Sequence, residues 1–381
     1  MNNKKSFHWQ HFLGWVGVIA IIGVVGTSLY RNKFPSRAAT SVAPIQLGMI
    51  GHFSGEYASY GVPMLQAAEL AIKKINDDGG INGRPLQLVT EDDVSNATTA
   101  ATAMNKLIHI DNLNYILSAE SSGVASVVAP LAENNGRLLM ITLGSSPGLT
   151  DVGKYIFRTV PSDAYQAVEM NNLIDNTIKS KKVAGLYLND AYGRGIQKII
   201  DQDSNVPHVD NEFFNENDTD VRTQLTKIKA SGADTLVVVA HSEYPYILKQ
   251  IKELQVPVTI ITSETFKDEK MLSDSGAAAE GIYVSFMPPQ VDYAGFSQAF
   301  QATYAEAPSA YSMYAYDGVV ALAKALGEAK DAANVEQVRN ALLGIRLNGA
   351  SGQVGFSSDG DRAGSIYTAY LVKNGHFQEV K

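Results

Sequence analysis

Small hydroxyl residues stand directly after apolar runs that the pattern predicts to be strands. Ser121 and Ser122 follow the strand predicted at 114–118 and open a helical run at 124–132. Serine hydroxyls beside the N–H groups of a helix start form a site for a carboxylate, through hydrogen bonds and the helix dipole. Plain capping of the helix is the alternative for these two serines, and the two roles can coexist.

Two further loops carry groups of the same kind. Gly144, Ser145 and Ser146 follow the strand predicted at 138–142. Glu264 follows the strand predicted at 258–262, and a lone carboxylate at a strand end can pair with an ammonium group. Together these loops would hold both charged ends of an α-amino acid. A solvated loop acid is the alternative for Glu264.

No set of residues assembles into a catalytic or metal centre. The seven histidines are scattered, and no zinc-protease, nucleophile-elbow or phosphate-loop motif is present. With no cysteine, thiolate chemistry and Cys-ligated zinc are excluded. Acid pairs such as Asp92–Asp93 fall at strand ends, where we interpret them as solvated turn residues. We therefore expect no enzyme, no metal and no cofactor.

The elements that position these loops alternate regularly after residue 44. Strands are predicted at 45–50, 86–90, 114–118, 138–142, 183–188, 235–240, 258–262 and 281–285, with helical patterns between most of them. Such alternation is typical of α/β folds with parallel sheets and helical crossovers.

Both halves of the chain begin with a strand, a polar loop, a Tyr-Gly pair and a helix. The pairs are Tyr60–Gly61 and Tyr192–Gly193. Two similar lobes would place both tyrosines at the carboxyl ends of strands, where open sheets bind ligands. The alternative is that Tyr-Gly is only a common turn pair.

The length and net charge of the chain restrict the number of lobes and the kind of partner that we expect. A chain of 381 residues is long enough for two lobes, and its net charge of −8 without a basic run argues against nucleic acid as a partner. Near the N-terminus, Phe12 to Tyr30 is uncharged and mostly apolar, and as a helix it would reach about 28 Å, close to a bilayer's hydrocarbon thickness. An uncleaved membrane anchor and a cleaved signal segment both remain open, and the length favours the anchor.

Two stretches carry a family resemblance. Ser-Gly-Glu-Tyr-Ala-Ser-Tyr-Gly at 54–61 is followed by Ile-Asn-Asp-Asp-Gly-Gly-Ile-Asn-Gly at 75–83. This pair resembles the leucine/isoleucine/valine-binding family of type I periplasmic solute-binding proteins of ABC transporters, and the resemblance covers 44–381. It implies two Rossmann-like lobes with parallel sheets joined by a three-stranded hinge. The implied division is an anchor or signal segment with linker at 1–43, an N-terminal lobe at 44–162 and 288–357, and a C-terminal lobe at 163–287 and 358–381.

The resemblance also implies ligand contacts. Ser122 and Ser146, with the backbone near Gly144, look like carboxylate and ammonium contacts in the first lobe. Tyr60 and Tyr192 look like aromatic lips that close over the ligand. The full predicted set is Tyr60, Ser122, Gly144, Ser145, Ser146, Tyr192, His241, Glu264 and Tyr311.

The side-chain pocket departs from the family pattern. Tyr311 falls where an aromatic residue lines that pocket, and His241 replaces a small residue or tyrosine near another contact. Glu264 falls where leucine-binding relatives keep an acid for the ammonium group. The departure at His241 puts the particular amino acid in doubt more than the amino-acid class.

The expected function is capture of a branched-chain or similar amino acid between two closing lobes. We expect a monomer that delivers its ligand to an ABC permease, in the periplasm or on the outer face of the cytoplasmic membrane, with the N-terminal segment in or through the membrane. The alternatives are a ligand-sensing subunit of a signalling complex, and an amide, urea or aromatic-acid binder on the same fold.

Overall fold

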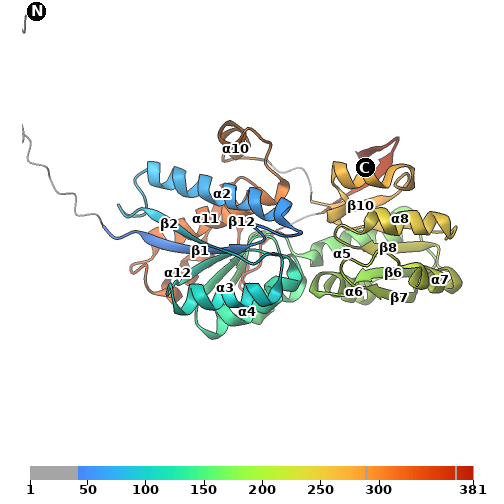
Figure 1. Ribbon diagram of the computed structural model, residues 1–381, viewed down its shortest axis with the longest axis horizontal. Coiled ribbons are helices and arrows are strands. Elements are labelled where there is room, and N and C mark those ends of the chain that lie inside the picture. The colour runs from blue at the N-terminus through green and yellow to red at the C-terminus, as the bar shows by residue number, and fades with distance from the viewer. Residues whose placement is uncertain (1–41, 288–290, 365–366, 381) are drawn as a thin grey trace, which may run out of the picture. The chain divides into compact units, whose positions relative to one another are not determined.

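The N-terminal lobe is built on a five-stranded sheet whose strands all pair in parallel, in the order β2-β1-β3-β4-β5 (Figure 1). This computed structural model describes residues 42–287, 291–364 and 367–380, so the predicted membrane segment at 12–30 lies outside the described residues. The strands are β1 (Ile45–Gly51), β2 (Leu86–Asp92), β3 (Tyr115–Ala119), β4 (Leu138–Ile141) and β5 (Ile156–Arg158). Among the described helices, none is long and apolar enough to cross a membrane.

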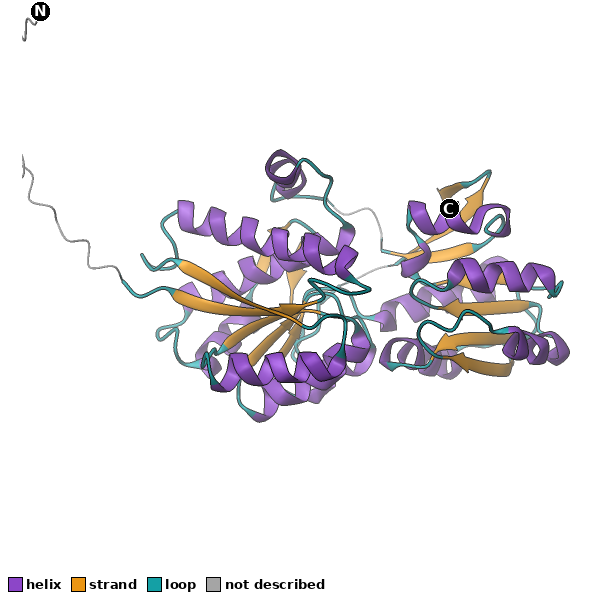
Figure 2. Ribbon diagram, in the orientation of Figure 1, coloured by secondary structure: helices purple, strands orange, loops and turns teal. Residues whose placement is uncertain are grey.

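Helices cover both faces of this sheet (Figure 2). One core contains Leu47 and Met49 of β1 with α2 and α11, and the other contains Ile50 with α3 and α4. Since side chains alternate along a strand, β1 serves both cores. The helices of this lobe are α2 (Ala58–Asp77), α3 (Ala97–His109), α4 (Ser122–Asn134), α10 (Phe296–Tyr304), α11 (Ala310–Glu328) and α12 (Val335–Gly344), with a short 3₁₀ turn η1 (Pro147–Val152) and a hairpin β11 (Arg346–Gly349) and β12 (Gly352–Gly355).

The C-terminal lobe has a seven-stranded sheet in the order β14-β13-β10-β9-β8-β6-β7. Five of its strands pair in parallel, and β13 and β14 add an antiparallel pair at one edge that the sequence analysis did not predict. The strands are β6 (Val183–Leu188), β7 (His208–Phe214), β8 (Thr235–Val239), β9 (Thr259–Thr262), β10 (Tyr283–Phe286), β13 (Thr368–Lys373) and β14 (His376–Glu379).

Helices again lie on both faces. Residues of α7 and α8 pack on one face, and residues of α5 and α6 pack on the other. The elements are α5 (Asp163–Asn172), the π-helix η2 (Leu173–Ile178), α6 (Ala191–Asp203), α7 (Arg222–Ser231), α8 (Tyr244–Glu253), η3 (Glu264–Phe266), α9 (Glu269–Ser275) and η4 (Gly276–Ala278).

The chain crosses between the lobes after β5, after β10 and after β12. The crossing segments are tied together by Arg158 of β5, whose Nε donates to Asp361 at 2.7 Å, and by Arg362, whose Nη1 donates to the carbonyl of Thr159 at 2.8 Å. Val160, Met287, Tyr314 and Tyr367 form a small apolar cluster beside them. The two-lobed α/β architecture expected from the sequence is confirmed.

Candidate ligand-binding site

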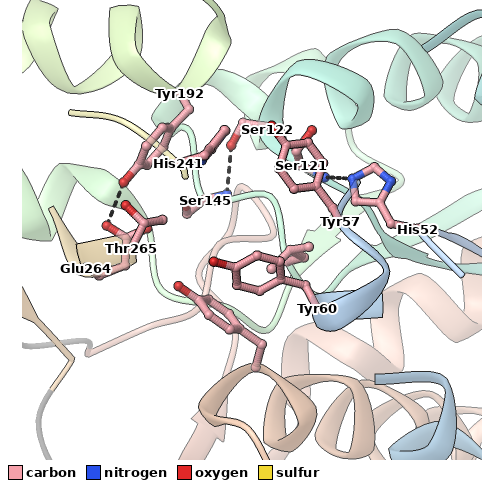
Figure 3. A pocket seen from close by; sticks show the side chains of 12 residues that line it. His52, Tyr57, Tyr60, Ser121, Ser122, Ser145, Tyr192, His241, Glu264 and Thr265 are labelled. Atoms are coloured by element: carbon pink, nitrogen blue, oxygen red, sulfur yellow. Dashed lines mark hydrogen bonds between the residues drawn. The ribbon is translucent and has the colours of Figure 1, made fainter. Parts of the chain in front are cut away.

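A pocket lies where loops at the carboxyl ends of strands from both sheets come together (Figure 3). It holds about 440 Å³ between its walls, part of which is open to solvent. Seven of the predicted contacts line it: Tyr60, Ser122, Ser145, Tyr192, His241, Glu264 and Tyr311. Ser121, which the sequence analysis named beside Ser122, lines it too, as do four residues that the prediction left out: His52, Tyr57, Leu143 and Thr265.

The serine side of the pocket is formed by the start of α4 and the loop after β4. Ser121 is the N-cap of α4, but no side chain caps this helix start. The hydroxyl of Ser122 instead accepts the N–H groups of Ser145 and Ser146, both at 3.1 Å. Because its oxygen already accepts two bonds, the hydroxyl hydrogen of Ser122 is available for a bound acceptor. Uncapped N–H groups of a helix start also favour an anion here.

Glu264 stands on the opposite side, in the turn η3 directly after β9. Its side chain is 5% exposed, so it is not the solvated loop acid that the sequence left open. The hydroxyl of Tyr192 donates to its Oε2 at 2.8 Å. Burial raises the pKa of Glu264, while this hydrogen bond from Tyr192 acts in the opposite direction. No Lys or Arg lines this pocket in the part of the chain that the structure describes.

A second buried acid lies behind Glu264. Asp163, in the first turn of α5, is fully buried, and neither of its carboxyl oxygens has a hydrogen-bond partner among the described residues. Burial and the neighbouring charge of Glu264 hold the pKa of Asp163 well above its ordinary value. Each of these two buried carboxylates disfavours the ionisation of the other.

Aromatic rings from both lobes close the remaining walls. Tyr192 stacks on His241, with ring centroids 5.1 Å apart, and Tyr57 meets His241 edge-on at 5.6 Å. Tyr60 and Tyr311 pack edge to face at 5.6 Å. Burial lowers the pKa of His241, but Asp190 and nearby acids outweigh it, so that the pKa is raised. The walls thus combine flat apolar surfaces with a few polar groups, as small-molecule sites usually do.

The two Tyr-Gly pairs occupy equivalent places in the lobes. A Cβ on Gly61 would lie 2.0 Å from the carbonyl oxygen of His52, and one on Gly193 would lie 2.1 Å from that of Leu188. Each glycine therefore lets its helix start pack against the strand end before it, and each preceding tyrosine lines the pocket. Both pairs lie inside helices, so the alternative of a common turn pair is wrong.

Gly144 and Ser146 are not brought into the pocket. The Ser146 hydroxyl donates to the carbonyl of Ala191 at 2.8 Å, which links the two lobes. A side chain on Gly144 would point at Leu149 and Ala125 rather than at the cavity. Their predicted role as ligand contacts stays a prediction that this geometry does not support.

The missed residues had little sequence signal. His52 was one of seven scattered histidines, and Tyr57 stood inside the 54–61 stretch without a spacing that marked it. Thr265 directly follows Glu264, and its hydroxyl donates to the carbonyl of Ala240 at 2.7 Å. Position in a loop after a strand is the one signal that could have found them.

Two contacts beside the pocket join the lobes. The hydroxyl of Tyr57 donates to Glu216, and the amide of Asn217 donates to Glu56 at 3.1 Å. Glu56 and Tyr57 precede α2 in the N-terminal lobe, whereas Glu216 and Asn217 follow β7 in the C-terminal lobe. These contacts are of the kind expected when two lobes close over a ligand. Within the described ranges, no group of three or more acidic, His or Cys residues could hold a metal ion.

Two α/β lobes with a small polar and aromatic pocket between their strand ends define a two-lobed solute-binding protein. The family model for "Periplasmic binding protein" matches residues 44–376, and the chain belongs to this family. The family consists of solute-binding proteins rather than enzymes, which confirms that the chain is not an enzyme. Its members are periplasmic.

Three similar proteins are named for, or were solved with, different ligands. The leucine-, isoleucine-, valine-, threonine- and alanine-binding protein of Pseudomonas aeruginosa is 26% identical over 335 residues, which cover 86% of this chain and 89% of that protein. The branched-chain amino acid transporter substrate-binding protein LivJ of Streptococcus pneumoniae, solved with isoleucine, has a TM-score of 0.75 at 27% identity and covers 89% of this chain and 99% of that chain. A solute-binding protein of R. palustris solved with benzoate has the same fold, with a TM-score of 0.75 at 17% identity, 88% of this chain and 95% of that one.

Proposed function

We propose that this protein binds an α-amino acid, branched-chain or similar, between its lobes and delivers it to an ABC permease. Ser122 and the start of α4 would hold the carboxylate, and Glu264 would hold the ammonium group. Tyr60, Tyr192, His241 and Tyr311 would enclose the side chain, together with Tyr57 and Leu143. The proposal places the protein in the periplasm or on the outer face of the cytoplasmic membrane.

The buried carboxylate of Glu264 opposite the serine side is the observation that carries this proposal. No Lys or Arg is among the described residues that line this pocket, and Lys267 and Lys270 line an adjoining cavity that Glu264 shares, so a bound ammonium would offset this acid. A zwitterionic amino acid brings one charge for each side of the pocket, so no charge is left buried without a partner. The names of the relatives that bind leucine, isoleucine and valine point in the same direction.

An aromatic acid such as benzoate is the second candidate, since a structure of the same fold was solved with benzoate. Its carboxylate would fit the serine side, but it has no ammonium group to face Glu264. We therefore expect benzoate to bind far more weakly than an amino acid, and more weakly still as Glu264 ionises at higher pH.

We also propose how the chain is divided between the lobes. Residues 44–162 and 288–357 would form the N-terminal lobe, and residues 163–287 and 358–381 the C-terminal lobe. The strands of the two sheets and the three crossings are consistent with these boundaries.

Thermal unfolding of the purified full-length protein tests the ligand class. The panel is the twenty common L-amino acids, urea, short amides and benzoate. A compound at 100 times its dissociation constant should add about 2.7 kcal/mol to the free energy of unfolding. A midpoint shift confined to one group of amino acids would support the proposal and name the group. A shift with benzoate or urea alone would refute it.

A further inference from the structure

A buried chain of polar groups lies behind the serine side of the pocket, outside the predicted contacts. His52 follows β1, Asp93 follows β2, and Glu120 follows β3, so all three stand at the carboxyl ends of neighbouring strands. Each is 0% exposed. His52 also lines the ligand pocket, and Figure 3 shows its ring bonded to the backbone of Ser121.

The hydrogen bonds of His52 fix where its proton lies. The backbone N–H of Ser121 can only donate, and it lies 2.9 Å from Nε2 of His52, so Nε2 is the unprotonated nitrogen. Nδ1 therefore carries the hydrogen and donates it to Oδ1 of Asp93 at 2.7 Å. The same Oδ1 accepts the N–H of Ser95 at 2.7 Å. These two bonds select the tautomer of His52 that carries its hydrogen on Nδ1.

The Asp93 and Glu120 side chains need one more proton between them. Oδ2 of Asp93 and Oε1 of Glu120 are buried acceptors without a hydrogen-bond partner in the described residues. Oε2 of Glu120 accepts the hydroxyl of Ser118 at 2.6 Å. Burial and the neighbouring charge of Asp93 hold the pKa of Glu120 well above its ordinary value, while the hydrogen bond from Ser118 acts in the opposite direction. A hydrogen bond from a protonated Glu120 to Asp93 would satisfy both oxygens at once.

We infer that Glu120, Asp93 and His52 form a hydrogen-bond relay that positions the start of α4 for ligand binding. The inference rests on the proposed function, because it assigns these residues to the carboxylate side of the same pocket. None of the three needs to touch the ligand. They act as positioning residues through the peptide group between Glu120 and Ser121.

His52 would position the start of α4 through the N–H group of Ser121 and through the adjacent residue Ser122. His52 holds the N–H of Ser121, and the next residue, Ser122, accepts the N–H groups of Ser145 and Ser146. The loops after β1, β2, β3 and β4 are thus joined in one hydrogen-bonded series. If His52 released Ser121, this peptide could rotate, and Ser122 and the helix start would lose the orientation that a carboxylate requires.

The arrangement of protons can be tested without any ligand. In full-length protein labelled with ¹⁵N-histidine, the NMR spectrum at neutral pH should show His52 with a protonated Nδ1 and an unprotonated Nε2. The His52→Gln variant assigns the signal by its loss. A ring protonated on Nε2, alone or with Nδ1, would overturn the relay.

Affinity measurements test the positioning role. Calorimetry uses L-leucine, and in addition the panel compound that gives the largest unfolding shift. His52→Ala and Glu120→Leu should each weaken binding about tenfold or more, because each leaves a buried group without its partner. Glu120→Gln should stay within about threefold of the wild type, since its amide can donate to Asp93 as the protonated acid does. His52→Gln should recover part of the loss, because its amide oxygen can accept from Ser121.

A matched control lies in the other lobe. His208 is paired with Asp201 at 2.9 Å, but it does not line the pocket, so His208→Gln should leave affinity unchanged. Unfolding midpoints of every variant separate lost affinity from lost folding. Unchanged affinity in a folded His52→Ala protein, or a loss in Glu120→Gln as large as in Glu120→Leu, would overturn the relay. Failure of the proposed ligand class would show differently, as a wild-type protein that binds no amino acid in the panel.

Discussion

The hydroxyl of Tyr192 donates a hydrogen bond of 2.8 Å to Oε2 of Glu264, and both side chains line the pocket. Tyr192 lies in the first turn of α6 and Glu264 in the turn η3 after β9, so the bond joins a helix start to a strand end within the C-terminal lobe. The phenol occupies one oxygen of the acid. A buried acid held in this way is suited to a single ammonium group.

Glu264→Gln should therefore weaken amino-acid binding strongly. The amide keeps the shape of the side chain but leaves a desolvated ammonium without its counter-charge, at a cost on the order of 2–5 kcal/mol. Calorimetric titration of the full-length variant with L-leucine and with the best panel compound measures the loss. Glu269→Gln is the control, because Glu269 is an exposed acid in the first turn of α9. Equal affinities for wild type and Glu264→Gln would remove Glu264 from the ammonium site.

The bond between Tyr57 and Glu216 joins the two lobes beside the pocket, and its removal should speed ligand release. Tyr57→Phe keeps the ring against His241 but loses the hydroxyl that donates to Glu216. Because Glu216 is exposed, the bond is partly screened by solvent, and we expect a loss in affinity of about two- to fivefold. Stopped-flow dissociation should place most of it in the off-rate. Tyr165→Phe, at an exposed position of α5, should change nothing, and an off-rate unaltered by Tyr57→Phe would contradict the role of this contact.

The sequence predicted the buried parallel strands well for a physical reason. Strands covered on both faces, such as β6 and β8, are continuous apolar runs, so hydropathy alone marks them. The strand β7 was missed because it is an edge strand with the sequence His-Val-Asp-Asn-Glu-Phe-Phe, where burial is partial and polar residues are frequent. The antiparallel strands β13 and β14 were missed because the prediction relied on strands that alternate with helices, and no helix separates the two strands of this hairpin.

The candidate site was predictable where a residue's own neighbourhood in the sequence carries the signal. Ser122 and Glu264 stand in loops directly after apolar runs, and the structure places both in the pocket. His52 and Asp93 are 41 residues apart, so their contact could not be read from spacing. The interpretation of Asp93 as a solvated turn residue was wrong: it is 0% exposed, because its carboxylate is bonded to the loop after β1.

Asp163 should make the protein less stable as pH rises. Its pKa is raised in the folded state, so the native protein holds a proton that the unfolded chain releases at the ordinary aspartate pKa of about 3.9. Stability is therefore lost as pH climbs from that value through the folded pKa, and the loss persists above it.

Asp163→Asn removes this penalty, because an amide carries no charge at any pH. Near neutral pH the variant should be more stable, by about 1.4 kcal/mol for each unit that the folded pKa lies above the ordinary value. Below the ordinary aspartate pKa the difference should vanish. Chemical denaturation between acid and neutral pH measures both. Asp203→Asn, at an exposed position of α6, should show no such trend, and a constant difference for Asp163→Asn at all pH values would refute the assignment.

Gly360 fixes the geometry of one crossing between the lobes, and replacing it should destabilise the fold. Its φ is +86°, and a Cβ there would lie 2.1 Å from the carbonyl oxygen of Ile156. Its own carbonyl accepts the N–H of Arg158 at 3.0 Å. Gly360→Ala should therefore cost about 2–4 kcal/mol, from backbone strain together with the steric clash.

Gly364→Ala separates the two causes, because Gly364 has a φ of +75° but open space around it, and it should cost only about 1 kcal/mol. Denaturant unfolding measures both variants, and equal losses would show that the close approach to Ile156 contributes nothing.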